Sequence, residues 1–211
     1  MVITNKIVLR QLSKRQWIRP EVGLQRLQTS SFFSKILPEV GGSRTWRKGR
    51  FKKYWEEFQA ALFTYGLSQQ SPDYDWEYSY GELPSFPDGD CFVRCEIADG
   101  AIKPVQLKEL VPAELNAQSS IQQLIDNLTL NYTATPGQEM LVVAIYVNRE
   151  TTINFQQLRM PKLNIEQLWL YGFLYGDNCF LVGGDPDGHP KRYNFTYPRL
   201  SLDAAISSGS P

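Results

Sequence analysis

Hydrophobic and polar residues in the middle of the chain follow the two-residue period of β-strands. Residues 90–97 form a short, mainly apolar run, and residues 102–111 alternate apolar with polar side chains. The dipeptide Asp99-Gly100 lies between the two segments, and Asp-Gly is typical of the tight turn that joins antiparallel strands. The pattern predicts a β-hairpin over residues 90–111.

The polar side chains of this hairpin are expected on one face. Successive side chains of a strand point to opposite faces, so Gln106 and Lys108 share one face and Leu107 and Glu109 share the other. With an even turn register, Asp90 joins Gln106 and Lys108. A carboxylate, an amide and an ammonium group then converge on one side, whereas Glu109 faces away from them.

Three further segments repeat apolar residues with the spacing of an amphipathic α-helix. The first spans residues 44–65 and is expected to stop at Gly66, the second spans 116–131, and the third spans 164–173. The second and third each begin with an asparagine, which can cap a helix. The apolar positions behind these predictions are Trp55, Phe58, Leu62 and Tyr65; Ile121, Leu124, Ile125 and Leu128; and Ile165, Leu168, Trp169 and Phe173.

Other apolar stretches predict further strands. The near-continuous run at residues 140–147 is typical of a central strand buried on both faces. We expect it to pair in parallel with residues 102–111, through the intervening helix and a right-handed crossover. Residues 76–80 alternate aromatic with polar side chains and predict a strand beside the hairpin, and residues 179–182 predict a short strand. Together these segments predict one α/β domain over residues 43–206, with a mixed central sheet flanked by helices.

The first 42 residues carry a weaker pattern. Residues 3–12 suit a strand or a short helix, residues 24–33 suit a helix, and Gly41-Gly42 is typical of a boundary. We expect residues 1–42 to form a basic N-terminal extension that faces a partner. The Ser/Gly/Pro-rich tail, residues 207–211, is expected to fray.

Charge is divided unevenly along the chain, although the net charge is zero. Residues 1–55 carry 13 Lys or Arg against two acidic residues, so the rest of the chain holds an equal excess of acids. The densest basic stretch, residues 44–53, can bind nucleic-acid phosphates, or it can be a solvated helix start that offsets the acidic half. Its six basic residues are Arg44, Arg47, Lys48, Arg50, Lys52 and Lys53.

Several functional classes are disfavoured by what the sequence lacks. No apolar run approaches the roughly 20 residues of a membrane-spanning helix, and the first residues do not resemble a secretory signal, so we expect a cytoplasmic protein without membrane contact. Cys91, Cys95 and Cys179 lack C-x-x-C spacing, which argues against a zinc site or a disulfide framework. The single histidine, His189, leaves little basis for a Ser-His-Asp triad.

The spacing of the polar hairpin residues resembles the PD-(D/E)XK nuclease superfamily. In that family an aspartate begins one strand and an acidic-x-Lys or Gln-x-Lys triplet lies on the next. Here Asp88, in Pro-Asp-Gly, or Asp90 precedes the triplet Gln106-Leu107-Lys108. The predicted order of helix, three strands, helix and strand over residues 44–148 also fits the family core. The resemblance implies a restriction-endonuclease-like fold.

The same resemblance implies a set of site residues. Asp90, Gln106 and Lys108 would be catalytic, and Asp90 and Gln106 would bind Mg²⁺ or Mn²⁺ with help from Asp88 or Glu57. Glu57 is the weaker candidate, because it also suits an exposed helix position. Lys108 would orient or deprotonate the attacking water. Asp90 is favoured over Asp88, because it directly begins the apolar run, and Gln106 departs from the usual acid in being neutral.

Three functions are compatible with these patterns. The first is metal-dependent hydrolysis of DNA by an endonuclease, with the basic extension holding the duplex; the resemblance also allows a homodimer. The second is a non-catalytic nuclease-like domain that binds nucleic acid or a protein partner. The third is a small-molecule or assembly protein with an unrelated α/β fold, in which residues 102–111 need not lie beside residues 140–147.

Overall fold

The computed structural model describes residues 6–29, 50–83, 89–95, 101–132, 140–154 and 157–199. These segments contain the helices α1 (Lys6–Leu12), α2 (Pro20–Thr29), α4 (Arg50–Gln70) and α5 (Ile121–Tyr132). They also contain the strands β1 (Trp76–Tyr80), β2 (Cys91–Cys95), β3 (Ile102–Leu110), β4 (Val142–Val147), β5 (Gln167–Tyr175), β6 (Asn178–Gly184) and β7 (Lys191–Thr196).

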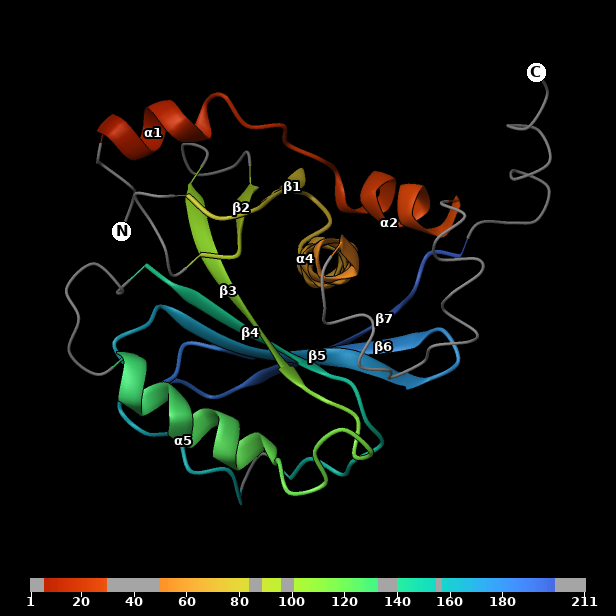
Figure 1. Cartoon of the computed structure of the whole chain (residues 1–211), viewed down its shortest axis with the longest axis vertical. Coiled ribbons are helices and arrows are strands. Elements are labelled where there is room, and N and C mark those ends of the chain that lie inside the picture. Colours follow the sequence, from red (N-terminus) through yellow and green to blue (C-terminus); the bar gives the residue numbers. More distant parts are fainter. Residues whose placement is uncertain are drawn as a thin grey trace.

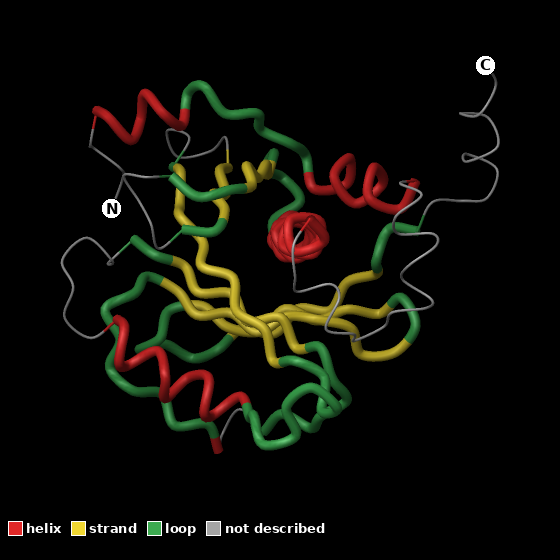
Figure 2. The backbone as a smooth tube through the Cα atoms, in the orientation of Figure 1, coloured by secondary structure: helices red, strands yellow, loops and turns green. Residues whose placement is uncertain are grey.

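The described strands form one seven-stranded mixed sheet in the order of the sequence. β3, β4 and β5 pair in parallel, and the strands on either side of this central trio pair antiparallel. The sheet curls around α4, which Figure 1 shows end-on, and α5 covers the opposite face (Figures 1 and 2). The described chain is therefore a mixed α/β structure with one helix inside the curl and one outside it.

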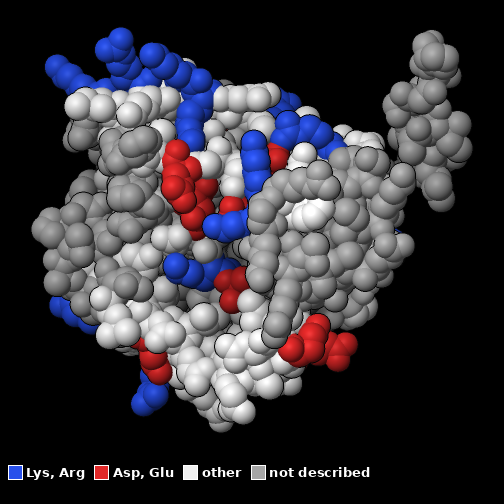
Figure 3. All heavy atoms as spheres, in the orientation of Figure 1, with Lys and Arg blue, Asp and Glu red and all other residues white. Residues whose placement is uncertain are grey.

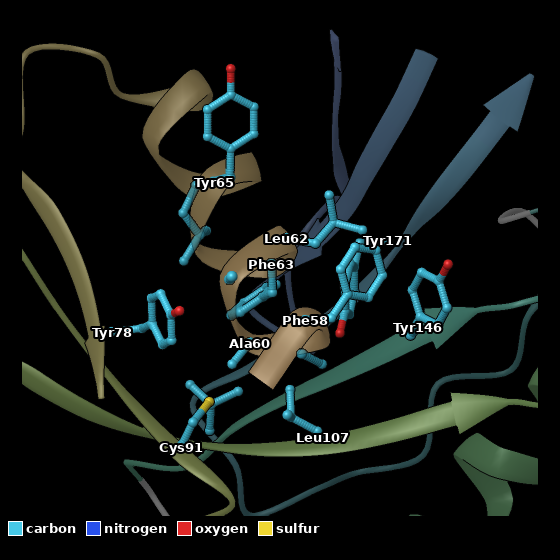
Figure 4. Packing of buried hydrophobic residues seen from close by; sticks show 14 of the residues in the cluster. Phe58, Ala60, Leu62, Phe63, Tyr65, Tyr78, Cys91, Leu107, Tyr146 and Tyr171 are labelled. Atoms are coloured by element: carbon cyan, nitrogen blue, oxygen red, sulfur yellow. The ribbon is translucent and has the colours of Figure 1, made fainter. Parts of the chain in front are cut away.

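Two hydrophobic clusters follow from the alternation of side chains across the sheet. Odd-numbered β3 residues Val105 and Leu107 belong to the cluster around α4, whereas Leu110 belongs to the cluster around α5. Figure 4 shows Cys91 on β2 and Leu107 on β3 pointing towards α4, near Ala60 and Phe58. All of α4 from Glu57 to Ser68 is buried, but Lys52, Lys53 and Tyr54 in its first turns are exposed.

The predicted pairings of the central strands are confirmed. β2 and β3 pair antiparallel as a hairpin, with Cys91 opposite Val105. The turn predicted at Asp99-Gly100 lies outside the described residues. β4 is buried at every position and pairs in parallel with β3, and α5 lies between them in sequence. β1 pairs with β2, and its aromatic side chains share the face that packs against the α4 cluster.

The first helix was predicted to stop at Gly66, which is wrong, because α4 continues to Gln70. A Cβ on Gly66 would lie 3.1 Å from the Phe195 ring of β7. The glycine therefore serves close packing inside the helix and does not terminate it. Because a glycine is compatible with both roles, the local sequence did not distinguish them.

The expected start of the second helix is also wrong. α5 begins at Ile121, whereas Asn116 lies in the preceding loop. Ser120 and Gln123 form a capping box: the Ser120 Oγ accepts a bond from the Gln123 N–H at 3.1 Å, and the Gln123 Oε1 accepts one from the Ser120 N–H at 3.0 Å. Two otherwise unpaired donors are satisfied at the observed start.

Residues 164–173 were predicted to form a helix, but residues 167–175 form β5. Leu168 and Leu170 pack into the α5 cluster, and Trp169 and Tyr171 pack into the α4 cluster. A strand buried on both faces needs apolar residues at nearly every position, and such a run also contains the helical spacing. This segment pairs with β4 on one side and with β6 on the other, and these pairings favour the strand over the helix.

The described part of the expected extension packs on the domain. Leu24 and Leu27 of α2 are buried in the cluster around α4. Val8 and Leu12 of α1 pack with Phe92 of β2 in a smaller cluster. Residues 6–29 thus supply core side chains. Among the described helices, none has the length and apolar character required to cross a bilayer.

Candidate active site

A fork between two strands forms the candidate site. β3 pairs with β2 only over Ile102–Val105, but it continues beside β4 as far as Leu110. The last strand bond on the β2 side is donated by the Asp90 N–H to the Val105 oxygen, at 2.9 Å. Among the described residues, β3 has no strand partner on this side beyond Val105, and the Asp90 side chain bonds to the Leu107 N–H there.

The Asp90 carboxylate is held by two donors from β3. Its Oδ2 accepts bonds from the Leu107 N–H at 2.7 Å and from the Gln106 side-chain amide at 2.5 Å. Both bonds use the same oxygen. Within the described part of the chain, Oδ1 accepts no hydrogen bond. Asp90 therefore presents one carboxylate oxygen that a ligand can use.

The surroundings of Asp90 act on its pKa in opposite directions. Burial raises the pKa of this carboxyl above its ordinary value, and the bonds from Leu107 and Gln106 counteract that effect. Glu56 raises the pKa of Asp90 further by repulsion, whereas the Lys108 ammonium lowers it. Both charged groups therefore lie close enough to Asp90 to interact with its charge.

Glu56, in the second turn of α4, is held in a network of its own. Its Oε2 accepts a bond from the Tyr80 hydroxyl at 2.6 Å, and its Oε1 lies 3.1 Å from the Lys52 ammonium. The hydrogen bond and charge of Glu56 are the main causes of a raised Lys52 pKa, with smaller contributions from Asp90 and Glu82. Lys52 thus lies within a group of acidic residues at the fork.

A recess between α4 and β3 adjoins this network. Its volume is about 150 Å³, and Lys108, Lys52 and Glu56 contribute to its wall. In Figure 3, acidic side chains gather in the hollow beside α4 with basic side chains next to them, and another basic group lies over α1. The remaining lining residues are Trp55, Gln59, Leu107 and Glu109.

Glu57 and Glu109 are held by other partners. Glu57 is buried and pairs with Arg26 of α2. Glu109 accepts bonds from Trp55 Nε1 at 3.1 Å and from Asn148 Nδ2 at 2.7 Å. The structure therefore brings Glu56, rather than the predicted Glu57, towards Asp90.

The structure describes only part of the predicted site. Asp88 and the basic residues Arg44, Arg47 and Lys48 lie outside the described residues. Arg50 begins α4, and Lys52 and Lys53 are exposed in its first turn. Asp90 and Gln106 are hydrogen-bonded at the fork, and Lys108 lines the adjoining recess. Gln106 turns its amide nitrogen towards Asp90, whereas metal binding by Gln106 would use its oxygen.

Sequence reasoning missed Glu56, Tyr80 and Tyr132. Glu56 and Glu57 are adjacent on one helix. Their roles differ because Glu57 pairs with Arg26, which is far from it in the sequence. Tyr80 was assigned to the aromatic face of its strand, and Tyr132 lies one residue beyond the predicted end of its helix. The alternation of β1 placed Tyr80 on the α4 side, which was the one available signal for its contact with Glu56.

Asp90 and Glu56 are the carboxylates at the fork that could hold a hard divalent cation. Among the described residues, no group of three or more His, Cys, Asp or Glu side chains could hold a metal ion. Mg²⁺ is commonly bound by one or two carboxylates and completes its shell with water and substrate phosphate oxygens. Asp90 and Glu56 supply that number of carboxylates. Comparison with family models, curated proteins and solved structures gives no match.

Proposed function

We propose that the protein is a metal-dependent DNA endonuclease with a restriction-endonuclease-like domain of the PD-(D/E)XK type. The observation that carries the proposal is the fork: the Asp90 carboxylate caps the Leu107 N–H where β3 runs past β2, with Gln106 and Lys108 beside it. Glu56 of α4 adds a second carboxylate. This arrangement supplies the acid, amide and lysine of the Gln-x-Lys variant, and a helix acid with them.

Each residue has a defined part in the proposed reaction. When bound by Asp90 and Glu56, a divalent cation supplies a Lewis acid for the phosphate and lowers the pKa of a bound water. The Lys108 ammonium orients the attacking water and stabilises negative charge that develops on the phosphate oxygens. Lys52, which pairs with Glu56, would supply a positive charge for a neighbouring phosphate.

The charge distribution supports a nucleic-acid substrate. The exposed Lys6 and Arg10 of α1 and Lys14 just after it lie on a helix whose buried side packs against Phe92, two residues from Asp90. Arg15 donates to the Gly81 backbone oxygen at 2.5 Å, and the Gly81 N–H donates to the Asp90 backbone oxygen at 2.9 Å. Basic side chains on such a surface bind the phosphate backbone.

DNA cleavage tests the proposal. Supercoiled plasmid and linear duplex are incubated with the purified protein in Mg²⁺ or Mn²⁺, and in chelator. We expect nicking or cutting only with metal, and a loss on the order of 100-fold or more in Asp90→Ala and Lys108→Ala. Asp187→Ala and Lys162→Ala, which change exposed loop residues of the same types, serve as matched controls and retain activity.

A second function is favoured by the neutral Gln106, whose amide nitrogen faces Asp90. A non-catalytic nuclease-like domain that binds nucleic acid or a protein needs no metal-binding oxygen at this position. Such a domain would shift DNA in a gel without metal-dependent nicking, and the shift would be the same in Lys108→Ala. That result, or equal cleavage by Asp90→Ala and the wild type, would reject the endonuclease.

A further inference from the structure

A buried tyrosine reaches the proposed active site from the opposite side of the sheet. Tyr132, the last residue of α5, is 3% exposed, and its hydroxyl donates to the Gln106 Oε1 at 3.0 Å. The Gln106 Nε2 in turn donates to the Asp90 Oδ2 at 2.5 Å. One side-chain amide therefore joins the helix outside the curled sheet to the carboxylate at the fork.

The chemistry of the two partners fixes the direction of this amide. An ionised carboxylate only accepts hydrogen bonds, so the group of Gln106 that faces Asp90 must be its NH₂. The carbonyl then points the other way and needs a donor, which the Tyr132 hydroxyl supplies. The reversed amide would set its oxygen against the Asp90 oxygen and would leave the carbonyl bond to Tyr132 unmade.

Tyr132 is itself held in place. Its ring belongs to the hydrophobic cluster between α5 and the sheet. Its backbone oxygen accepts a bond from the Asn164 N–H at 2.7 Å, which ties the end of α5 to the segment before β5. The hydroxyl is therefore presented to Gln106 from a fixed support, and rotation of the amide breaks its bonds at both ends.

We propose that Tyr132 is a positioning residue that locks the Gln106 amide with its nitrogen towards Asp90. Gln106 then orients Asp90 and is not itself a metal ligand. Because Gln106 and Leu107 both bond to Oδ2, the lock directs the other oxygen, Oδ1, away from β3. The lock is a property of the protein alone, whereas its effect on metal binding rests on the proposed function.

NMR of the metal-free, ¹⁵N-labelled full chain tests the lock without reference to activity. In the wild type, we expect downfield proton shifts for the Gln106 side-chain NH₂ and the Leu107 backbone N–H, because both donate to a carboxylate. Their hydrogens should also exchange slowly with water. In Tyr132→Phe, both signals move, and the Gln106 NH₂ approaches the position of an exposed glutamine. Thermal unfolding verifies that the variant is folded.

Tyr193→Phe is the matched control, because the Tyr193 hydroxyl accepts a bond from another glutamine, Gln70, at 3.0 Å. This change should move the Gln70 signals and leave those of Gln106 and Leu107 in place. If the Gln106 and Leu107 signals are the same in Tyr132→Phe as in the wild type, the lock is overturned, whatever the protein does to DNA.

Calorimetric titration with Mn²⁺ tests the consequence for the site. Loss of one hydrogen bond that orients a ligand should weaken binding by about fivefold to tenfold in Tyr132→Phe. In a Gln106→Ala background, the same tyrosine change should have no further effect, because the two residues act in series. Equal affinities of the wild type and Tyr132→Phe would overturn the positioning role.

The two arms separate this inference from the proposed function. A wild-type protein that binds no Mn²⁺ and yet shows the expected change in the Gln106 signals has the lock but not the nuclease site. If the wild type shows metal-dependent cleavage and the Gln106 signals are unchanged in Tyr132→Phe, the protein has the nuclease site but not the lock.

Discussion

The acidic side chains Asp90 and Glu109 both bond to groups near β3, but their surroundings differ. Both Glu109 oxygens accept bonds, one from Trp55 on α4 and one from Asn148 after β4. Both bonds to Asp90 reach a single oxygen. Glu109 therefore ties a helix to the sheet, whereas Asp90 keeps an oxygen for a ligand. In this pair, the acid with both oxygens bonded is the structural one, and the acid with one unbonded oxygen is the candidate for function.

Two adjacent acidic residues of α4 differ in their location and in the partners that hold them. Glu57 is buried against Arg26, which joins α4 to α2, while Glu56 lies at the recess and interacts with Lys52 and Tyr80. One acid of each pair supports the fold and the other lies at the fork. Substitutions should therefore lower activity at Glu56 and stability at Glu57 and Glu109, and the reverse result would contradict these assignments.

The largest effect is expected at Glu56. Glu56→Gln removes one of the two carboxylates available to a cation and should lower metal-dependent cleavage on the order of 100-fold, with little loss of stability. Glu57→Gln should do the opposite: cleavage stays within about twofold, and the free energy of unfolding falls by about 1 kcal/mol, since its partner Arg26 is half exposed. Cleavage rates and urea unfolding of both variants measure this, and a reversed pattern contradicts it.

The second effect concerns stability at Glu109. Glu109→Ala leaves the Trp55 and Asn148 donors without their acceptor and should lower the free energy of unfolding by about 2 kcal/mol. Glu109→Gln keeps an acceptor oxygen and should cost less. Urea denaturation at neutral pH measures both. A loss of Mn²⁺ affinity in folded Glu109→Gln would show that this acid belongs to the site after all.

The smallest effect is expected for Asp90→Asn, which should raise stability by an amount that depends on pH. Its raised pKa means that the folded protein disfavours the ionised carboxyl, so Asp90 costs stability as the pH rises through that pKa. The neutral variant Asp90→Asn should therefore have a higher Tm than the wild type at pH 7, and the difference should shrink as the pH falls and Asp90 becomes protonated. Thermal unfolding at several pH values measures the trend, and a Tm difference that grows towards acid pH would contradict it.

The sequence predicted the hairpin, the parallel crossover and the shared location of Asp90 and Gln106, because each depends on a local period or on the parity of one strand. It did not predict β5, since a run that is apolar throughout satisfies both the strand and the helix period. It also did not separate Glu56 from Glu57. That choice depends on Arg26, which is distant in sequence and reaches α4 only after α2 has packed.

The enclosure of α4 has a consequence for altering the protein. From Glu57 to Ser68 the helix has no exposed position, so substitutions there disturb packing in several directions at once. Its first turn carries Lys52 and Lys53, which are exposed to solvent. Substitutions at the exposed end beside the fork can therefore change surface charge with little effect on packing, whereas substitutions in the enclosed part of the helix alter the core.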